Sequence, residues 1–224
     1  MFLVDRDYSQ YGEQEIIIKY FENTQRPYKK YCVDAGAFDG VVGSNSRILF
    51  LNGWTGLLIE PNPRTFQRLA SLYRERTDIS CIQVALSDSA KSGVPMEFSV
   101  GPPGVTEDDK WMYAQVSTLH KEFAESYKHG YGYIYESAEV DTETLEHVLL
   151  SVNAPVHFGF LSVDCEGEDI KIIRAFDFKK YAPLLVCVES DDNNRPFFAE
   201  VLEMEGYQYL AHTVSNTFYE RKQP

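Results

Sequence analysis

The stretch Tyr31-Cys-Val-Asp-Ala-Gly-Ala-Phe-Asp-Gly40 decides the fold of this 224-residue chain. Residues 31–34 predict a buried strand, and Gly36 and Gly40 predict a turn in which the backbone approaches a ligand closely. Residues 44–51 follow with the apolar spacing of a helix. A strand, a glycine turn and a helix begin a nucleotide-type cofactor site, although glycines at such a turn are also ordinary loop punctuation.

The charges beside this turn indicate the cofactor. The two glycines are separated by three residues, a spacing that departs from the dinucleotide fingerprint and fits a pyrophosphate poorly. Asp34 and Asp39 repel phosphate and suit a ligand with an ammonium or sulfonium group, and S-adenosylmethionine carries both cations. Glu60, at the end of an apolar strand, has the position of an acidic residue that accepts bonds from ribose hydroxyls.

Composition and charge narrow the class of protein. With 44% hydrophobic residues, the chain can bury one sizeable core, so we expect a single domain over residues 1–224. Acidic residues outnumber basic ones by 34 to 21, and the net charge of −13 argues against a nucleic-acid or membrane partner. Four cysteines without a Cys-x-x-Cys pair indicate reduced core thiols, and no apolar run suits a signal peptide or a membrane span. We therefore expect a cytoplasmic protein.

Helix and strand patterns alternate along the chain, which predicts a mostly parallel sheet with helices on both faces. We expect helices over 13–21, 44–51, 64–74, 143–150, 169–176 and 197–204. We expect strands over 31–34, 56–60, 79–86, 157–164 and 184–189. Two final strands, over 207–212 and 217–221, predict a C-terminal antiparallel hairpin.

The alternation breaks between about residues 88 and 140. We expect an inserted lid or substrate-binding segment here, with short strands of its own and a disordered tip at residues 107–110. Tyr131, Tyr133 and Tyr135 alternate, as in a half-buried edge strand or a stacking platform. His120 and His129 lie in polar surroundings and are expected to be exposed, with a role as general base as the alternative.

Acidic side chains follow two of the expected strands. Asp164 ends one strand, Glu166 and Glu168 follow in a glycine-containing turn, and Glu189 with Asp191 ends the next strand. Ligands bind at this edge of open sheets, and we expect Asp164, or else Glu166, to serve as the base for a hydroxyl nucleophile. Glu166 alternatively orients substrate hydroxyls. Asp164 and Glu189 either share a proton, hold a divalent cation such as Mg²⁺, or bond to helix N-termini.

Several sequence blocks, in this order, resemble the FkbM-type family of S-adenosylmethionine-dependent methyltransferases. The resemblance runs from about residue 8 to residue 189. The blocks are Ser9-Gln-Tyr-Gly-Glu-Gln14, Val33-Asp-Ala-Gly-Ala-Phe-Asp-Gly40, Leu58-Ile-Glu-Pro-Asn-Pro63, Ala85-Leu-Ser87 and Leu161-Ser-Val-Asp-Cys-Glu-Gly-Glu168. The resemblance implies an α/β fold of the class I methyltransferase (Rossmann-like) type, with a seven-stranded, mostly parallel sheet and a C-terminal antiparallel hairpin.

The resemblance also implies cofactor contacts. The residues implied for the methionine and ribose ends are Asp34, Gly36, Asp39 and Glu60. Ser44 and Asn45 would open a helix whose N-terminus receives the cofactor carboxylate. The residues implied around the adenosine are Pro61, Asn62, Ser87 and Asp88, with Asp88 bonding the adenine amino group. Ser9 and Gln10 would close over the cofactor, although Ser9 is equally a cap or turn residue.

We expect methyl transfer to oxygen, and the resemblance implies a hydroxyl of a sugar or glycosylated small molecule as the acceptor. The sequence leaves open whether the protein forms a homo-oligomer. One alternative is a non-catalytic nucleotide-binding scaffold or regulator that retains the pocket, against which the presence of Asp34 and Glu60 argues. The other is a nucleotide-sugar or NAD-binding enzyme, against which the glycine spacing argues.

Overall fold

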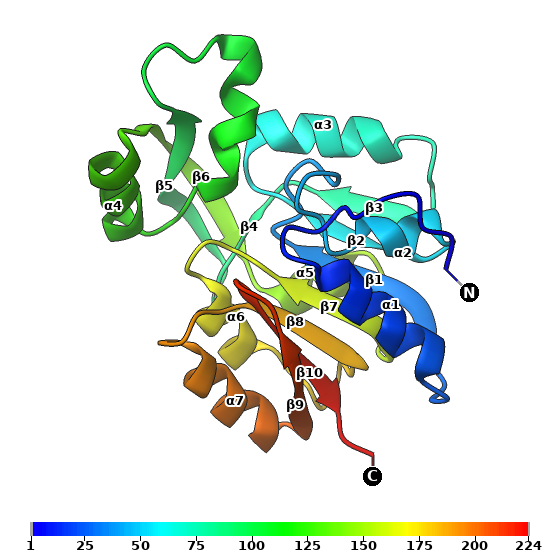
Figure 1. Ribbon diagram of the computed structural model, residues 1–224. Coiled ribbons are helices and arrows are strands. Elements are labelled where there is room, and N and C mark those ends of the chain that lie inside the picture. The colour runs from blue at the N-terminus through cyan, green and yellow to red at the C-terminus, as the bar shows by residue number, and fades with distance from the viewer. Residues whose placement is uncertain (1, 224) are drawn as a thin grey trace.

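The computed structural model describes residues 2–223, and its main body is a seven-stranded sheet (Figure 1). The strand order is β3-β2-β1-β7-β8-β10-β9. The parallel strands are β1 (Lys29–Ala35), β2 (Thr55–Ile59), β3 (Ile79–Ile82), β7 (Phe158–Val163) and β8 (Leu185–Glu189). The antiparallel strands are β9 (Tyr207–His212) and β10 (Asn216–Arg221). The expected sheet and its C-terminal hairpin are confirmed.

The centre of the sheet lies between β1 and β7. β1 pairs with β2 on one side and with β7 on the other, so the ends of β1 and β7 are neighbours. Ala35 pairs with Val163, and the Asp164 amide donates a hydrogen bond of 2.9 Å to the Ala35 carbonyl. The chain leaves these two strands toward opposite sides of the sheet, and open α/β sheets bind ligands at such a point.

Helices cover both faces because successive strand residues point to opposite sides. Cys32 packs in one apolar cluster and its neighbour Val33 in the other. The helices on the Cys32 side are α1 (Glu13–Asn23), α2 (Arg47–Leu51) and α3 (Pro63–Tyr73). Those on the Val33 side are α5 (Leu145–Ser151), α6 (Asp169–Ala175) and α7 (Arg195–Met204). Within residues 2–223, no helix has the length and apolar character needed to cross a bilayer.

The helix after the glycine turn begins later than its sequence predicted. α2 starts at Arg47 with Ser46 as its N-cap, and Ser44 and Asn45 lie before the helix. The Ser44 hydroxyl accepts a bond from the Arg47 amide (3.0 Å), and the Ser46 hydroxyl donates to Asp34 (2.5 Å). α2 has only five residues, so the expectation of a helix N-terminus opened by Ser44 and Asn45 was wrong.

A second sheet of three strands projects from one end of the main sheet (Figure 1, green). Its strands are β4 (Ala85–Leu86), β6 (Ile134–Glu143) and β5 (Lys91–Gly101), in that order. The 3-10 helix η1 (Glu107–Val116) and helix α4 (Lys121–Tyr131) lie between β5 and β6 in the chain. β5 and β6 have 11 and 10 residues, so the inserted segment contains long strands and extends past the expected bounds of 88 and 140.

Three expectations for this region were wrong. The strand expected over 79–86 is two strands, because the chain leaves the main sheet after Ile82 and β4 pairs with β6 instead. The tip at 107–110 is helical. Within the tip, Lys110 forms an ion pair with Glu107 (2.5 Å), and a second ion pair with Glu136 (3.0 Å) anchors the tip to β6. Tyr131 ends α4, and Gly132 caps that helix with a φ of 67°, so the edge-strand alternative for Tyr131, Tyr133 and Tyr135 was wrong, while the stacking platform stays a prediction.

Candidate active site

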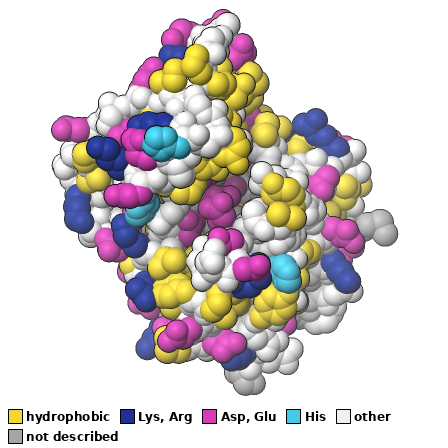
Figure 2. All heavy atoms as spheres, turned by 60° about the vertical axis from the view of Figure 1, so that its left-hand side comes forward, with side chains coloured by type: hydrophobic (Ala, Val, Ile, Leu, Met, Phe, Trp, Pro, Cys, Tyr) yellow, Lys and Arg dark blue, Asp and Glu magenta, His cyan; other side chains and the backbone are white. Residues whose placement is uncertain are grey.

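A cleft of about 650 Å³ lies at the carboxyl edge of the main sheet, beside the inserted segment. Figure 2 shows acidic side chains gathered in the hollow between the projecting part and the main body. The acidic lining residues are Asp34, Glu60, Asp164, Glu166, Glu168 and Glu189. Among residues 2–223, no lysine, arginine or histidine lines this cleft. The cleft therefore favours a cationic ligand or one rich in hydrogen-bond donors.

The glycine turn brings the ends of β1 and β7 into contact. Gly36 has a φ of 86°, and a Cβ at this position would collide with the carbonyl oxygen of Asp164. The amides of Gly36 and Ala37 both donate to the Ile59 carbonyl, at 3.0 and 2.9 Å. Only glycine combines this φ with this close approach, so the turn is also required by strand packing.

Asp34 and Glu60 are buried carboxylates at the ends of β1 and β2. Burial raises the pKa of Asp34 to about 6, although the bond from Ser46 lowers it. Burial raises the pKa of Glu60 to about 7, although the amides of Asn62 (2.8 Å) and Phe38 (2.9 Å) donate to its two oxygens. A bound cation or hydroxyl donor would stabilise both carboxylates in their charged form.

Three further carboxylates meet beyond the ends of β7 and β8. One oxygen from each of Asp164, Glu166 and Glu189 lies within 4.8 Å of the others, and all three side chains are half-buried. Burial and repulsion by Asp169 raise the pKa of Asp164 to about 7. Burial raises the pKa of Glu166, and repulsion by Asp164 is the main cause that raises the pKa of Glu189. At neutral pH this cluster either shares protons or binds a cation.

The turn after β7 holds Glu166 in an unusual backbone conformation, with a φ of 49°. The Asp169 carboxylate accepts bonds from the amides of Cys165 (2.7 Å) and Gly167 (3.1 Å). From the inserted segment, the Thr118 hydroxyl donates to the Glu166 carbonyl (2.8 Å). The acid cluster and the inserted segment are thus directly bonded.

His120 reinforces this connection, contrary to the expectation that it is exposed. It is half-buried, and its Nε2 lies 2.8 Å from Glu168. Glu168 is 3% exposed and accepts hydrogen bonds from Lys171 (2.6 Å) and the Ser87 hydroxyl (2.7 Å). A Cβ on Gly167 would lie 2.9 Å from the His120 ring. Glu168 is therefore a structural carboxylate that joins the insert, α6 and the end of β4.

The inserted segment supplies an aromatic wall. Tyr127, Tyr131 and Tyr133 line the cleft, with ring centroids 5.3 to 6.0 Å apart, and Tyr131 is 69% exposed. Burial, followed by the charges of Glu166 and Glu189, raises the pKa of Tyr127 to about 12. Tyr127 was missed from the sequence. Its signal was the spacing of four between it and Tyr131 on one helix, which places both side chains on one face.

The structure brings most of the predicted site residues to the cleft. Those that line it are Ser9, Gln10, Asp34, Gly36, Ser44, Asn45, Glu60, Pro61, Asp164, Glu166 and Glu189. Asp39, Asn62, Ser87 and Asp88 do not line it.

Each of these four residues has another position or role. Asp39 accepts bonds from the amides of residues 41 and 42, both at 2.9 Å. Asn62 caps α3 by accepting the amide of residue 64 (3.0 Å), and it donates to Ser117 of the insert (3.1 Å). Ser87 donates to the Glu168 carboxylate, and Asp88 is exposed and accepts a bond from the next residue (2.8 Å). These residues lie in sequence blocks that resemble a cofactor site, but in the structure their side chains form hydrogen bonds within turns or between elements.

Asn45 has an unsatisfied acceptor inside the cleft. The residue is 7% exposed, and its amide nitrogen donates a long bond of 3.5 Å to Ser162. Its carbonyl oxygen has no hydrogen-bond partner. Buried polar atoms are rarely left unpaired, so this oxygen is placed to accept a bond from a ligand.

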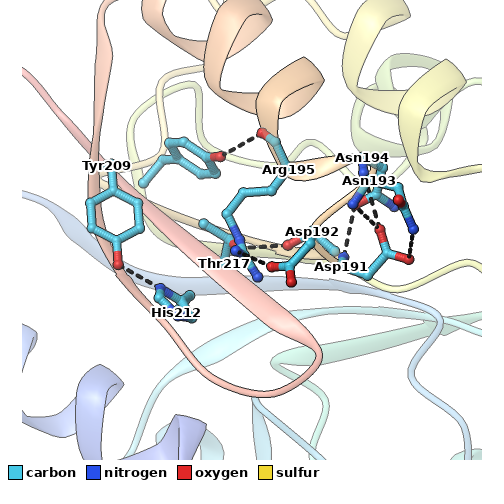
Figure 3. A network of polar contacts seen from close by, with 10 residues as sticks. Asp191, Asp192, Asn193, Asn194, Arg195, Tyr209, His212 and Thr217 are labelled. Atoms are coloured by element: carbon cyan, nitrogen blue, oxygen red, sulfur yellow. Dashed lines mark hydrogen bonds and ion pairs between the residues drawn. The ribbon is translucent and has the colours of Figure 1, made fainter.

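The loop that follows Glu189 is fixed to the C-terminal hairpin (Figure 3). Asp191 was expected to join the acidic edge, but it does not line the cleft. Its carboxylate accepts bonds from the amides of Asn193 (2.8 Å) and Asn194 (3.0 Å). Arg195, the first residue of α7, donates to Thr217 of β10 (3.1 Å). This network secures the end of β8, from which Glu189 enters the cleft.

The strand order and the position of the cleft define a class I methyltransferase fold. Comparison with protein families then identifies the particular family. The protein-family model described as the methyltransferase FkbM domain matches residues 34–211. The chain therefore belongs to the FkbM methyltransferase family.

The solved structures that resemble this chain share little of its sequence. Methyltransferase FkbM from Methylobacillus flagellatus KT has 14% identity and a TM-score of 0.53, and the match covers 97% of this chain and 48% of that one. This chain thus spans about half the length of that protein. Precorrin-6y C5,15-methyltransferase from Geobacter metallireducens GS-15 has 11% identity and a TM-score of 0.46, with coverages of 98% and 94%.

The N-terminal domain of human METTL16, in complex with SAH, has 11% identity and a TM-score of 0.45, with coverages of 95% and 68%. No curated protein matches the chain. At 14% identity, the similarity to methyltransferase FkbM concerns the fold alone.

Proposed function

We propose that this chain is an S-adenosylmethionine-dependent O-methyltransferase whose acceptor is a hydroxyl of a sugar or glycosylated small molecule. The observation that carries the proposal is a single cleft in which an acidic strand edge faces a tyrosine-bearing wall. The acidic edge suits a cationic cofactor, and the wall suits an acceptor with an apolar face.

The residues of the cleft fit the proposed cofactor. The unpaired oxygen of Asn45 and the carboxylate of Asp34 are acceptors suited to an ammonium group. Glu60 is suited to ribose hydroxyls, and Pro61 lies beside it to flank the adenosine. Ser9 and Gln10 line the outer part of the cleft; Gln10 can donate to a carboxylate, whereas the Ser9 hydroxyl donates to Asp7 (2.6 Å). S-adenosylmethionine, when bound, supplies a methyl group on a positively charged sulfur.

The carboxylates beyond β7 and β8 supply proton chemistry in this proposal. Asp164, with a pKa of about 7, can accept the proton of an acceptor hydroxyl at neutral pH. The charge of Asp164 raises the pKa of Glu189, so the two carboxyl groups can share one proton. Glu166 orients neighbouring hydroxyls of the acceptor.

The acceptor class follows from the wall and the charge of the cleft. Tyr131 and Tyr133 offer aromatic rings on which the apolar face of a sugar ring can pack, while carboxylates accept bonds from its hydroxyls. The absence of basic lining residues among residues 2–223 argues against a phosphorylated acceptor. A neutral or amino-substituted sugar fits best.

A divalent cation is a second candidate occupant of the acid cluster. Asp164, Glu166 and Glu189 offer oxygen ligands of the kind that Mg²⁺ prefers. If the cation takes part, chelation removes methyl transfer and Mg²⁺ restores it. If chelation and Mg²⁺ leave the rate and the heat of binding unchanged, the cation is excluded and the base is Asp164 alone.

The test of the proposal is transfer of a labelled methyl group from S-adenosylmethionine to a panel of free and glycosylated sugars. We expect an O-methylated sugar, with a rate that falls at least about 100-fold in Asp164→Asn, because general bases contribute about 10²- to 10⁴-fold. Glu203→Gln, which changes an exposed acidic residue of α7 outside the cleft, is the control. N-methylated amines as the only product, or equal rates in wild type and Asp164→Asn, would contradict the proposal.

A further inference from the structure

A second cavity, of about 460 Å³, lies at the opposite edge of the main sheet. Two hydrogen bonds between the ends of β7, β8 and β10 locate this cavity. The Leu184 amide, just before β8, donates to the Phe158 carbonyl at the start of β7 (2.9 Å). The Arg221 amide, at the end of β10, donates to the Leu184 carbonyl (2.9 Å). Because Asp164 and Glu189 follow the other ends of β7 and β8, this cavity is separate from the methyl-transfer cleft.

Two arginines line this cavity, and their surroundings differ from those of the other arginines. The arginines in ion pairs with carboxylates are Arg64, Arg74, Arg76 and Arg195. Those that lie over an aromatic ring are Arg6, Arg47, Arg68 and Arg174. Within the described range of 2–223, Arg26 and Arg221 do neither, and both line the cavity. Arg26 donates to the backbone carbonyl of Arg221, so the two residues are in contact.

The rest of the lining suits an anion with an apolar body. His157 lies exposed at the same cavity, and exposed Pro27 and half-buried Tyr28 give it apolar sides. No carboxylate lines it among the described residues, although the chain carries a net charge of −13. Glu220, the neighbour of Arg221 in the chain, does not line the cavity, and its carboxylate accepts a hydrogen bond from Gln208 (2.8 Å).

We propose that this cavity binds a small molecule whose carboxylate or phosphate group meets Arg26 and Arg221 and whose apolar body packs on Pro27 and Tyr28. A guanidinium presents its N–H groups in a planar fork that matches the oxygens of either anion. The inference does not depend on the proposed methyl transfer, because the two cavities share no lining residue.

The test is a nuclear magnetic resonance titration of the whole chain with benzoate, phenyl phosphate and the neutral benzyl alcohol. We expect at least one anion to give saturable shifts of the backbone amides of Phe158, Leu184 and Arg221. The tighter anion identifies the headgroup. Its dissociation constant should rise at least tenfold in Arg221→Gln and stay unchanged in Arg74→Gln, a surface arginine elsewhere. Benzyl alcohol should bind at least tenfold more weakly.

The Arg221 side chain makes no hydrogen bond or ion pair with residues 2–223, so Arg221→Gln should fold, and its urea unfolding midpoint checks this. Arg26→Gln provides the second variant, with the same expected loss of affinity. No saturable shift with either anion, equal affinity in wild type and both variants, or equal affinity for benzyl alcohol overturns the proposal.

Discussion

Gly36 is the residue at which fold and site depend most directly on one another. Its φ of 86° and its contact with the Asp164 backbone let β1 and β7 meet beneath the cleft. Gly12 has the same φ of 86° but has open space where a Cβ would lie. Comparison of Gly36 with Gly12 therefore separates the cost of a positive φ from the cost of a steric collision.

We predict that Gly36→Ala lowers the free energy of unfolding by at least about 2 kcal/mol more than Gly12→Ala. Strain from a positive φ costs about 1–2 kcal/mol in both variants, and the collision with Asp164 adds to it only at Gly36. Urea unfolding measures both. Equal losses would show that the strands can move apart without cost.

The sequence predicted which residues could belong to the site better than it predicted the hydrogen bonds that direct their side chains. Asp34, Glu60 and Asp164 stand at strand ends, and a strand end in a parallel sheet fixes where a side chain lies. Asp39 and Asp88 stand in turns, where a local hydrogen bond to the backbone decides the direction of the side chain. No sequence pattern distinguishes these two cases.

At the scale of elements, the inserted segment is bonded to both sides of the cleft by one short stretch. Ser117 accepts a bond from Asn62 on the cofactor side, and Thr118 donates to Glu166 on the acidic side. His120 adds the contact with Glu168. The base of the insert is thus fixed.

We predict that Thr118→Val loosens the turn after β7, because it removes the bond to the Glu166 carbonyl and leaves the His120 amide without its acceptor. The loss of buried hydrogen bonds should lower the free energy of unfolding by about 1–3 kcal/mol. Amide hydrogen exchange at residues 165–168 should become faster than in wild type. Thr118→Ser keeps the hydroxyl and should retain slow exchange; slow exchange in Thr118→Val would contradict the role given to the hydroxyl.

The elements of the main sheet were predictable because their signals are local. β7 is a continuous buried run, and the final hairpin pairs neighbours in sequence. The second sheet was not predictable as such. Its β4 has two residues that continue an apolar run from β3, and its partner β6 lies far along the chain. The change of sheet after Ile82 is set by that distant pairing.

For the whole molecule, the main physical cost is the burial of acidic groups in one cleft. Glu60 and Asp164 have pKa values of about 7 and Asp34 of about 6, all above their usual ranges because of burial. In the unfolded chain these groups lose their protons near pH 4. The folded state therefore binds more protons between pH 5 and 7, and its stability falls as the pH rises through that range.

We predict that the free energy of unfolding decreases from pH 5 to pH 7.5, and that Glu60→Gln reduces this decrease. Glu60 alone contributes on the order of 3 kcal/mol, at about 1.4 kcal/mol for each unit by which its pKa is raised. Urea unfolding at a series of pH values measures it. Exposed carboxylates with lowered pKa values, such as Asp78 and Glu136, act in the opposite direction but only at lower pH. An identical pH dependence in wild type and Glu60→Gln would contradict this account.

The most direct test of the central claim is a calorimetric titration of S-adenosylhomocysteine into the wild type, Asn45→Ala and the control Glu203→Gln, which changes an exposed acidic residue of α7 outside the cleft. Asn45→Ala removes the unpaired oxygen together with the long bonds of the amide nitrogen to Ser162 (3.5 Å) and Cys187 (3.8 Å), so its urea unfolding midpoint is compared with that of the wild type. We predict binding to the wild type and to Glu203→Gln, and an affinity at least tenfold lower in Asn45→Ala. No binding to the wild type, or tighter binding of NAD than of S-adenosylhomocysteine, would contradict the assignment of this cleft.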